Sequence, residues 1–421
     1  MTEPADDAAL PQKPRLRGGS LWTMAGLIAS RGFVAGAGFL ASVLWARSFD
    51  QDTYGKYQIA VAAAAVVASF CLTGLNDAAL ISAAKKKDGN LGSIIKLRLG
   101  VSAIGALVVA GWGVVRYRDD VPMMLAFVIS AALFVPLQLQ PLWVAFTNGK
   151  RRFRLLTTGQ VVLAAANVVG IAAFTVLGAT APAMLPWVIL ASQGLSVAVG
   201  LYLQLMLQRM KENDDRDAAI VRYGHHVTAA SLLAWVFSSD RLIVGEVLSN
   251  ADVALLSVAL VMPNQVKVFF SAFEQVFLPH VTAAASVAAA WDYIKPRIVR
   301  LWGAYTALGI IGFFVLPIAI PMFFSAKYVN AVPYAKWLWL SLCLSSPFTF
   351  LASILNSQRD KRFLYIKNLA NPAITLVLFA ILIPRYGLAG AVGARITNHV
   401  LLVILHVGYF ARAVKVSRTA R

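Results

Sequence analysis

The stretch VPMMLAFVISAALFVPLQLQPLWVAFTNGKRRFR, residues 121–154, decides the class of fold. From Pro122 to Phe146 it carries no charged residue, and about 20 apolar residues suffice for a helix to cross the roughly 30 Å hydrocarbon core of a bilayer. The basic cluster Lys150–Arg154 follows, as is usual on the cytoplasmic side of a membrane span. The stretch therefore predicts a transmembrane helix whose C-terminal end faces the cytoplasm.

The composition of the whole chain extends this prediction. Of 421 residues, 59% are hydrophobic and 14% are charged, and the mean hydropathy is +0.70. A soluble domain carries about 25% charged residues, so lipid must be the solvent for most of this chain. The net charge of +19 could suggest nucleic-acid binding, but Lys and Arg cluster in short loops rather than on a polar face with interleaved aromatic residues.

Twelve runs are long and apolar enough to span a bilayer. Their connections are short and leave no room for a soluble domain, and the polar start of the chain shows no cleavage site, so we expect the first run to be retained as a span. The runs are Ser20–Leu44, Tyr57–Leu75, Ile94–Val115, Pro122–Phe146, Leu155–Leu177, Met184–Leu207, His226–Glu246, Val253–Leu278, Ile298–Phe324, Ala335–Leu355, Phe363–Ile383 and Leu388–Ala411.

The basic residues assign the sides of the membrane. With the N-terminus in the cytoplasm, most of the 38 Lys and Arg residues fall in cytoplasmic segments, where they are favoured. The predicted outer loops hold only Arg47, Lys56, Arg116, Arg118, Lys327, Lys336 and Arg385. This asymmetry predicts that both termini lie in the cytoplasm.

An internal repeat divides the chain into two halves. The fourth run contains Pro136 and ends in FTNGKRRFR, and the tenth contains Pro347 and ends in LNSQRDKRFL. Six spans in each half with a constant offset predict two lobes of the same orientation. We expect a tail at 1–19, a lobe at 20–207, a polar linker at 208–225, a second lobe at 226–411 and a tail at 412–421.

Charges inside membrane helices are costly and usually face a bundle interior or a wet cavity. Arg31 lies within the first run, and Asp240 and Arg241 lie within the seventh. We predict that the two arginines line a cavity and attract an anion. Asp240 is the first candidate for ion coupling, because a buried carboxylate can exchange protons near neutrality. The alternative for each is a structural ion pair between helices.

The eighth run carries a polar stripe, Asn264, Lys267, Ser271 and Glu274, whose spacing places it on one helix face. Such a stripe on an otherwise apolar span is typical of a helix that lines an aqueous path. We predict that Asn264, Lys267 and Ser271 bind substrate and that Glu274 takes part in ion coupling. A buried contact between Lys267 and Glu274 is the alternative.

The twelfth run repeats the pattern with Arg395, His399 and His406. We assign Arg395 to substrate binding and His399 to ion coupling, since histidine titrates near physiological pH. A hydrogen-bonded packing role is the alternative for each histidine. Pro136, Pro141 and Pro347 remove helical hydrogen bonds, and their recurrence in both halves predicts hinges for alternating access.

Several chemistries are excluded. There is no GxxxxGK[ST] loop, so the chain has no ATPase of its own, and no HExxH, CxxC or GxSxG motif is present. The two cysteines, Cys71 and Cys343, lie in apolar runs and predict neither a metal site nor a disulfide. We therefore expect no cofactor, and transport energy from a proton or sodium gradient.

Three motifs in order resemble the polysaccharide transporters of the O-antigen flippase family, within the multidrug/oligosaccharidyl-lipid/polysaccharide exporter superfamily. The first is VLWARSFDQDTYGKYQIAVA at Val43–Ala62, with Tyr54-Gly55-Lys56-Tyr57, closed by Gly74-Leu75. The second is SSDRLIVGEVLS in the seventh run, and the third is LIPRYGLAGAVGARI at Leu382–Ile396. The second half departs from the family pattern at Ser249–Val261, where Gly-x-Tyr is common.

This resemblance implies two six-helix lobes around a central cavity in the bacterial inner membrane. It implies movement of an undecaprenyl-diphosphate-linked oligosaccharide toward the periplasm for O-antigen, capsule or exopolysaccharide synthesis, with polymerase and chain-length components as partners. It implies a transporter and not an enzyme. Two alternatives stay open, a multidrug cation exporter, which should have a more acidic cavity, and a membrane-embedded polymerase or ligase, which should need larger outer loops.

Overall fold

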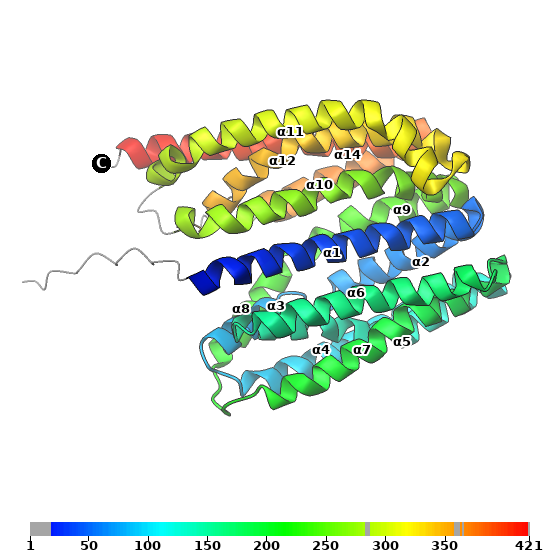
Figure 1. Ribbon diagram of the computed structural model, residues 1–421, viewed down its shortest axis with the longest axis horizontal. Coiled ribbons are helices and arrows are strands. Elements are labelled where there is room, and N and C mark those ends of the chain that lie inside the picture. Colours follow the sequence, from blue (N-terminus) through cyan, green and yellow to red (C-terminus); the bar gives the residue numbers. More distant parts are fainter. Residues whose placement is uncertain (1–17, 283–286, 358–362, 364–365, 420–421) are drawn as a thin grey trace, which may run out of the picture.

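The computed structural model describes residues 18–282, 287–357, 363 and 366–419, and in this part of the chain it contains helices and their connections but no strand. The long helices run nearly parallel to one another (Figure 1). The α-helices, long and short, are α1 (Gly18–Ser48), α2 (Gln51–Ser69), α3 (Leu75–Ala84), α4 (Asn90–Arg116), α5 (Val121–Gly149), α6 (Phe153–Val176), α7 (Leu185–Arg209), α8 (Ala218–Ala230), α9 (Val236–Val247), α10 (Asn250–Thr282), α11 (Val287–Phe324), α12 (Val332–Ser357) and α14 (Asn371–Thr419).

The helices form two lobes. Helices α1–α7 make the first lobe, and α9–α14 make the second (Figure 1). Within the first lobe α5 packs against α4 and α7, and within the second α12 packs against α11 and α14. The proline-bearing helices α5 and α12 thus each pack against several helices of their own lobe, and the repeat stays a prediction. Helix α8 runs through the predicted boundary between 225 and 226 and packs against α3 of the first lobe.

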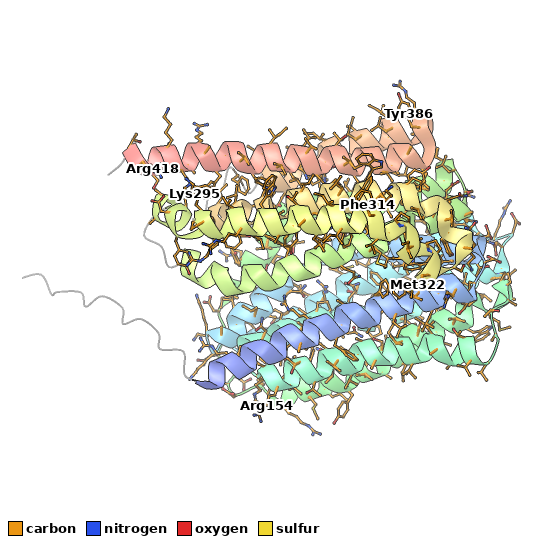
Figure 2. The ribbon with its side chains drawn as sticks, turned by 45° about the horizontal axis from the view of Figure 1, so that its top comes forward. Arg154, Lys295, Phe314, Met322, Tyr386 and Arg418 are labelled. Atoms are coloured by element: carbon orange, nitrogen blue, oxygen red, sulfur yellow. The ribbon has the colours of Figure 1, made fainter. Side chains whose placement is uncertain are left out.

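The two ends of the bundle differ. Both described ends of the chain lie at one end, together with Arg154, Lys295 and Arg418, whereas Met322 and Tyr386 lie at the other (Figures 1 and 2). We call the first the terminal end and the second the distal end. Chain ends on one side agree with an even number of crossings.

Two of the predicted spans are interrupted. The predicted helix Tyr57–Leu75 ends at Ser69 in the structure, and the chain turns before α3 begins at Leu75. Part of the cause is local, because Leu72 has a positive φ of 53°. The predicted helix His226–Glu246 is divided into α8 and α9, which meet at a bend of 48°. The polar triplet Ser239–Arg241, in contrast, lies inside continuous α9.

The last helix, α14, folds back on itself. Gly387 has φ 58° and ψ −136°, a combination outside the helical region that glycine adopts readily. Thr375 Oγ1 lies 3.0 Å from Asn398 Oδ1, although these residues would be about 35 Å apart along a straight helix. A Cβ on Gly390 would lie 1.9 Å from the carbonyl oxygen of Leu382. The predicted runs Phe363–Ile383 and Leu388–Ala411 are therefore the two arms of a hairpin.

Length and composition support an all-α membrane protein. Within the described residues, eight helices are long and apolar enough to cross a membrane, and the bent pair α8 and α9 would make a ninth. Helices α2 and α10, which coincide with two predicted spans, are not among them, and α14 counts once although it holds two predicted spans. The class of fold is confirmed, and the total of twelve crossings stays a prediction.

The lobes meet at the distal end. Asn250 Nδ2 of α10 donates to Asp52 Oδ1 of α2 over 2.8 Å, and Arg116 of α4 pairs with Glu246 of α9 over 3.0 Å. A Cβ on Gly55 would lie 1.8 Å from the carbonyl oxygen of Asn250. Only glycine permits this approach, so the Tyr-Gly motif of the first half packs against the equivalent helix start of the second.

Candidate functional site

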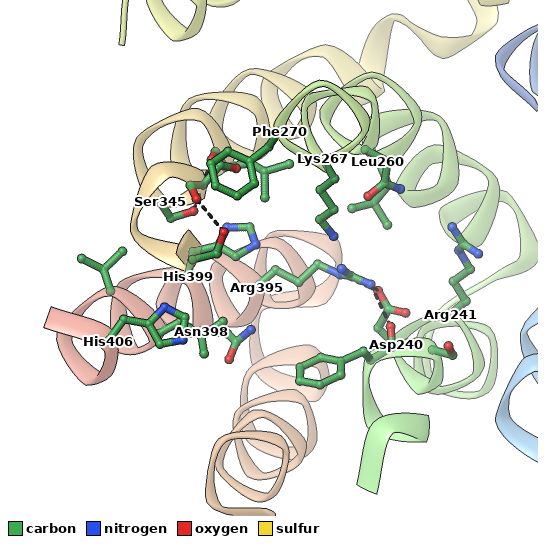
Figure 3. A pocket seen from close by; sticks show the side chains of 18 residues that line it. Asp240, Arg241, Leu260, Lys267, Phe270, Ser345, Arg395, Asn398, His399 and His406 are labelled. Carbon is green, nitrogen blue, oxygen red and sulfur yellow. Dashed lines mark hydrogen bonds and ion pairs between the residues drawn. The ribbon is translucent and has the colours of Figure 1, made fainter. Parts of the chain in front are cut away.

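The second lobe encloses a cavity of about 490 Å³, which we call the chamber. Its walls come from α9, α10, α12 and α14 (Figure 3). The charged side chains in its lining are Asp240, Arg241, Lys267 and Arg395. Among the described residues of the lining, three cations thus face one carboxylate, and this balance of charge suits an anion.

Asp240 and Arg395 form an ion pair in the chamber wall. Arg395 Nε donates to Asp240 Oδ2 over 2.7 Å, and Arg395 Nη2 lies 2.5 Å from the same oxygen (Figure 3). The Asp240 side chain is 1% exposed, whereas that of Arg395 is 17% exposed. The carboxylate is therefore buried behind the arginine, and the guanidinium faces the open space.

The other two cations are not neutralised in the same way. In the described part of the chain no ion pair involves Lys267, which is exposed toward the chamber. The Nε atom of Arg241 is buried and has no hydrogen-bond partner among the described residues. A charge without a counter-charge in a membrane protein is costly, and Lys267, which is exposed toward the chamber, is available to an anionic ligand.

Neutral polar groups complete the wall. His399 Nδ1 and Ser341 Oγ are 3.0 Å apart and share a hydrogen bond between α14 and α12. Asn398 accepts the hydrogen bond from Thr375 described above and is 7% exposed. His406, two turns farther along α14, is 1% exposed. The two histidines are thus wall residues of the chamber.

The predicted site residues separate into three groups. The structure brings together, in the lining of one cavity, the residues Asp240, Arg241, Asn264, Lys267, Arg395 and His399. Arg31 is an exposed residue of α1 in the other lobe and does not line the chamber. The side chains of Ser271 and Glu274 lie outside the described part of the structure. The functional roles of all nine residues stay predictions.

The predicted hinge prolines lie inside helices. Pro136 and Pro141 are in α5, and Pro347 is in α12. Both helices continue through these positions, so the prolines do not end them, and the hinge role stays a prediction. Helix α11 contains three more, Pro296, Pro317 and Pro321.

The first lobe has a smaller cavity of about 280 Å³, which we call the amide pocket. Its described lining contains Gln138, Asn167 and Gln193, together with two serines and apolar residues, and it contains no charged side chain. The two lobes therefore offer different chemistry, neutral hydrogen-bonding groups in the first and positive charge in the second.

A buried arginine was missed at the sequence level. Arg98 was not among the predicted intramembrane charges, although it lies within the predicted run Ile94–Val115, and in the structure it is 1% exposed inside α4. Its guanidinium donates to the carbonyl oxygen of Leu72 over 2.8 Å and to the carbonyl and side-chain oxygens of Gln138, each over 3.1 Å. Arg98 lies four residues inside the predicted run that begins at Ile94, and this position was the sequence signal that could have identified it as a buried arginine. Arg98 holds the break between α2 and α3 against α5.

A second missed group fixes the linker after α7. Lys150 Nζ lies 2.7 Å from Asp88 Oδ2 and 3.2 Å from Glu212 Oε2. The backbone amide of Glu212 donates to the same Asp88 oxygen over 2.9 Å. The side chain of Asp88 is fully buried. This network ties the linker to the loops before α4 and after α5, both in the first lobe.

The comparisons with known proteins agree with this architecture. The profile described as "Polysaccharide biosynthesis protein" matches residues 44–341, which is more than half of the chain. No curated protein sequence matches the chain.

Solved structures with the same fold include transporters. An inward-facing multidrug resistance MATE family transporter of the MOP superfamily is 12% identical, with a TM-score of 0.72 over 90% of this chain and 94% of that one. A MOP superfamily transporter from Pyrococcus furiosus, whose title reports reverse polarity of its binding pocket, is 12% identical, with a TM-score of 0.67 over 94% and 96%. The lipid II flippase MurJ in an inward closed conformation is 12% identical, with a TM-score of 0.60 over 95% and 91%. At these identities the likeness shows the fold.

Proposed function

This chain belongs to the polysaccharide biosynthesis protein family, and we propose that it is a flippase that moves an undecaprenyl-diphosphate-linked oligosaccharide across the bacterial inner membrane. Its fold is similar to that of MOP superfamily transporters, and we propose that it acts as a transporter. The end product would be O-antigen, capsule or exopolysaccharide. The resemblance inferred from the sequence motifs is confirmed at the level of the family and superfamily.

The charge of the chamber carries this proposal. Among the residues that the structure describes, Lys267, Arg241 and Arg395 face a single carboxylate, Asp240, in a membrane protein, where each charge is costly unless it serves a ligand or a path. A diphosphate offers several anionic oxygens and forms strong charge-assisted hydrogen bonds with arginine and lysine. A multidrug cation exporter would need the opposite sign of charge, so the chamber favours an anionic headgroup.

The pair between Asp240 and Arg395 offers a way to couple binding to an ion gradient. A diphosphate that enters the chamber competes with Asp240 for the guanidinium of Arg395, since both are anions that accept its hydrogen bonds. Exchange of the Arg395 guanidinium between Asp240 and the substrate would link the state of Asp240 to the presence of substrate, which is the link that ion coupling requires. His399 lies in the same wall.

The two lobes would divide the substrate between them. The uncharged amides and hydroxyls of the amide pocket suit sugar hydroxyl groups, and the chamber suits the diphosphate. We assign twelve crossings and place the terminal end in the cytoplasm. The positions of Arg154, Lys295 and Arg418 at that end support this orientation, because cytoplasmic segments are rich in basic residues.

A transport assay tests the charge argument. The purified chain in proteoliposomes should move a fluorescent undecaprenyl-diphosphate-linked oligosaccharide between leaflets. Lys267→Ala should weaken substrate binding about 10- to 150-fold, since a hydrogen bond to a charged group contributes about 1.5–3 kcal/mol. Lys96→Ala removes the same charge from an exposed position of α4 outside the chamber and should bind normally. Equal binding by the two variants would refute the assigned role of the chamber.

Asp240 has its own test. Asp240→Asn should abolish gradient-driven transport, because the amide cannot take up a proton, whereas Asp240→Glu should retain part of it. Transport is measured with and without an imposed pH gradient. Equal gradient-driven rates for both variants would remove the coupling role.

A further inference from the structure

A third cavity lies on the outer side of the second lobe. It has a volume of about 410 Å³ and is lined mainly by apolar side chains of α11, α12 and α14, among them Trp302, Trp337, Phe348, Val400 and Ile404. We call it the groove. Its rim is open, since Trp337 is 55% exposed and Ile404 is 63% exposed.

The groove and the chamber share a wall. Ser345, His399 and Val403 line both cavities. The hydrogen bond between Ser341 Oγ and His399 Nδ1 lies in this wall and joins α12 to α14. A cationic space inside the lobe and an apolar space on its outer surface are therefore separated by one layer of side chains.

The chemistry of the substrate requires such a pair of spaces. A lipid-linked diphosphate carries a headgroup that needs charge and hydrogen bonds and a chain that has no favourable place in a polar cavity. If the headgroup occupies the chamber, the chain must leave through a wall toward lipid. The wall at His399 is where an apolar cavity adjoins the chamber.

We propose that the groove holds the polyprenyl chain of the substrate while the diphosphate occupies the chamber, and that the seam between α12 and α14 at His399 is the passage between them. This inference rests on the proposed function. The groove follows α12 from Trp337 to Phe348, a length of about 16 Å at 1.5 Å per residue. It accommodates the first part of the chain, and the remainder stays in the bilayer.

The experiment should measure how close the polyprenyl chain lies to the groove, rather than how tightly it binds there. Lipid tails are as apolar as the groove, so transfer of the chain from bilayer to groove adds little binding free energy. The groove instead selects a chain whose headgroup is anchored next to it. A chain bound in this way should depart when the headgroup is displaced, and bulk phospholipid should not.

The first experiment uses a photoreactive amino acid at Val400, which is 52% exposed in the groove, and at Val169 of α6, which is 58% exposed in the other lobe and lines neither cavity. The full chain in nanodiscs is irradiated with tail-labelled undecaprenyl diphosphate. We expect at least tenfold more adduct at Val400 than at Val169, and loss of this excess when inorganic diphosphate is added. Equal amounts of adduct at both positions would overturn the proposal that the groove holds the polyprenyl chain. An excess at Val400 that inorganic diphosphate does not reduce would overturn it as well.

The second experiment fills the groove. Val400→Trp should slow transport of the lipid-linked oligosaccharide at least fivefold while inorganic diphosphate still binds, and Val169→Trp should transport normally. Normal transport by Val400→Trp would refute the role proposed for the groove and would leave the role proposed for the chamber unchanged. Failure of the unmodified chain to bind inorganic diphosphate would instead refute the proposed function, so the two failures are distinguishable.

Discussion

Gly55→Ala should weaken the contact between the lobes at the distal end. Gly55 is buried in α2, and the added Cβ would lie 1.8 Å from the carbonyl oxygen and 2.5 Å from the carbonyl carbon of Asn250. A normal carbon–oxygen contact is about 3.3 Å or more, so α2 and α10 would have to separate by roughly 1.5 Å. Both Asn250 atoms belong to the backbone and cannot turn aside as a flexible side chain could.

The expected magnitude follows from this overlap. Overpacking of a well-packed interface costs about 1–3 kcal/mol, which corresponds to a change of about 5- to 150-fold in an equilibrium constant. The gain in helix propensity from glycine to alanine, about 1 kcal/mol, is equal in both arrangements of the lobes if α2 stays helical. The variant should therefore increase the population in which the distal end is open by about 5- to 150-fold.

Nitroxide labels on Leu177 of the first lobe and Val329 of the second report this opening, since both are exposed at the distal end. Gly55→Ala should add a longer distance to the measured distribution. Gly111→Ala is the matched control, because its Cβ meets nothing within 4 Å, and it should leave the distribution unchanged. The same distribution for Gly55→Ala and the unsubstituted chain would refute the reasoning.

Three further predictions concern stability, measured by thermal unfolding in detergent. Arg98→Met should lower the free energy of unfolding by about 3 kcal/mol, since it leaves the carbonyl oxygens of Leu72 and Gln138 without their donor. An unchanged unfolding midpoint would contradict the stabilising role of Arg98. Lys150→Met should cost about 3–5 kcal/mol by stranding the buried Asp88 carboxylate, and adding Asp88→Asn should recover part of the loss. Gly387→Ala should cost about 1–3 kcal/mol, because its φ of 58° and ψ of −136° are strained for alanine; a stabilised variant would exclude this strain.

The sequence was most informative where the physical signal is local. Hydropathy over about 20 residues predicts a membrane span without knowledge of its neighbours, and each predicted run coincides with described helix over most of its length. The repeat around Pro136 and Pro347 stays a prediction, although both prolines lie inside long helices, α5 and α12. The breaks after Ser69 and at Ser231 were not predicted, because both segments are as apolar as the helices that they join.

Arg98 shows where a local rule fails. Counting basic residues near the end of a span assigns them to a loop, but this arginine lies one turn deeper and finds three oxygen acceptors on other helices. Those acceptors are 26 and 40 residues away in the chain, so only packing brings them together. Asp88 and Glu212 are likewise distant in the chain, and only packing brings the backbone amide of Glu212, in the linker, to the carboxylate of Asp88.

The amino-acid sequence by itself determined that this chain is an all-α membrane protein, and it predicted two related halves and intramembrane charges gathered on few helices. Each of these conclusions follows from the composition of a segment and from the spacing and position of its residues, without knowledge of how the segments pack. Only the tertiary structure decided that Arg395 pairs with Asp240, 155 residues away, that Lys267 faces the same chamber, and that Arg31 does not line it. The physical reason is that a side chain's partner depends on which helix faces pack together, and this is a property of the assembled bundle.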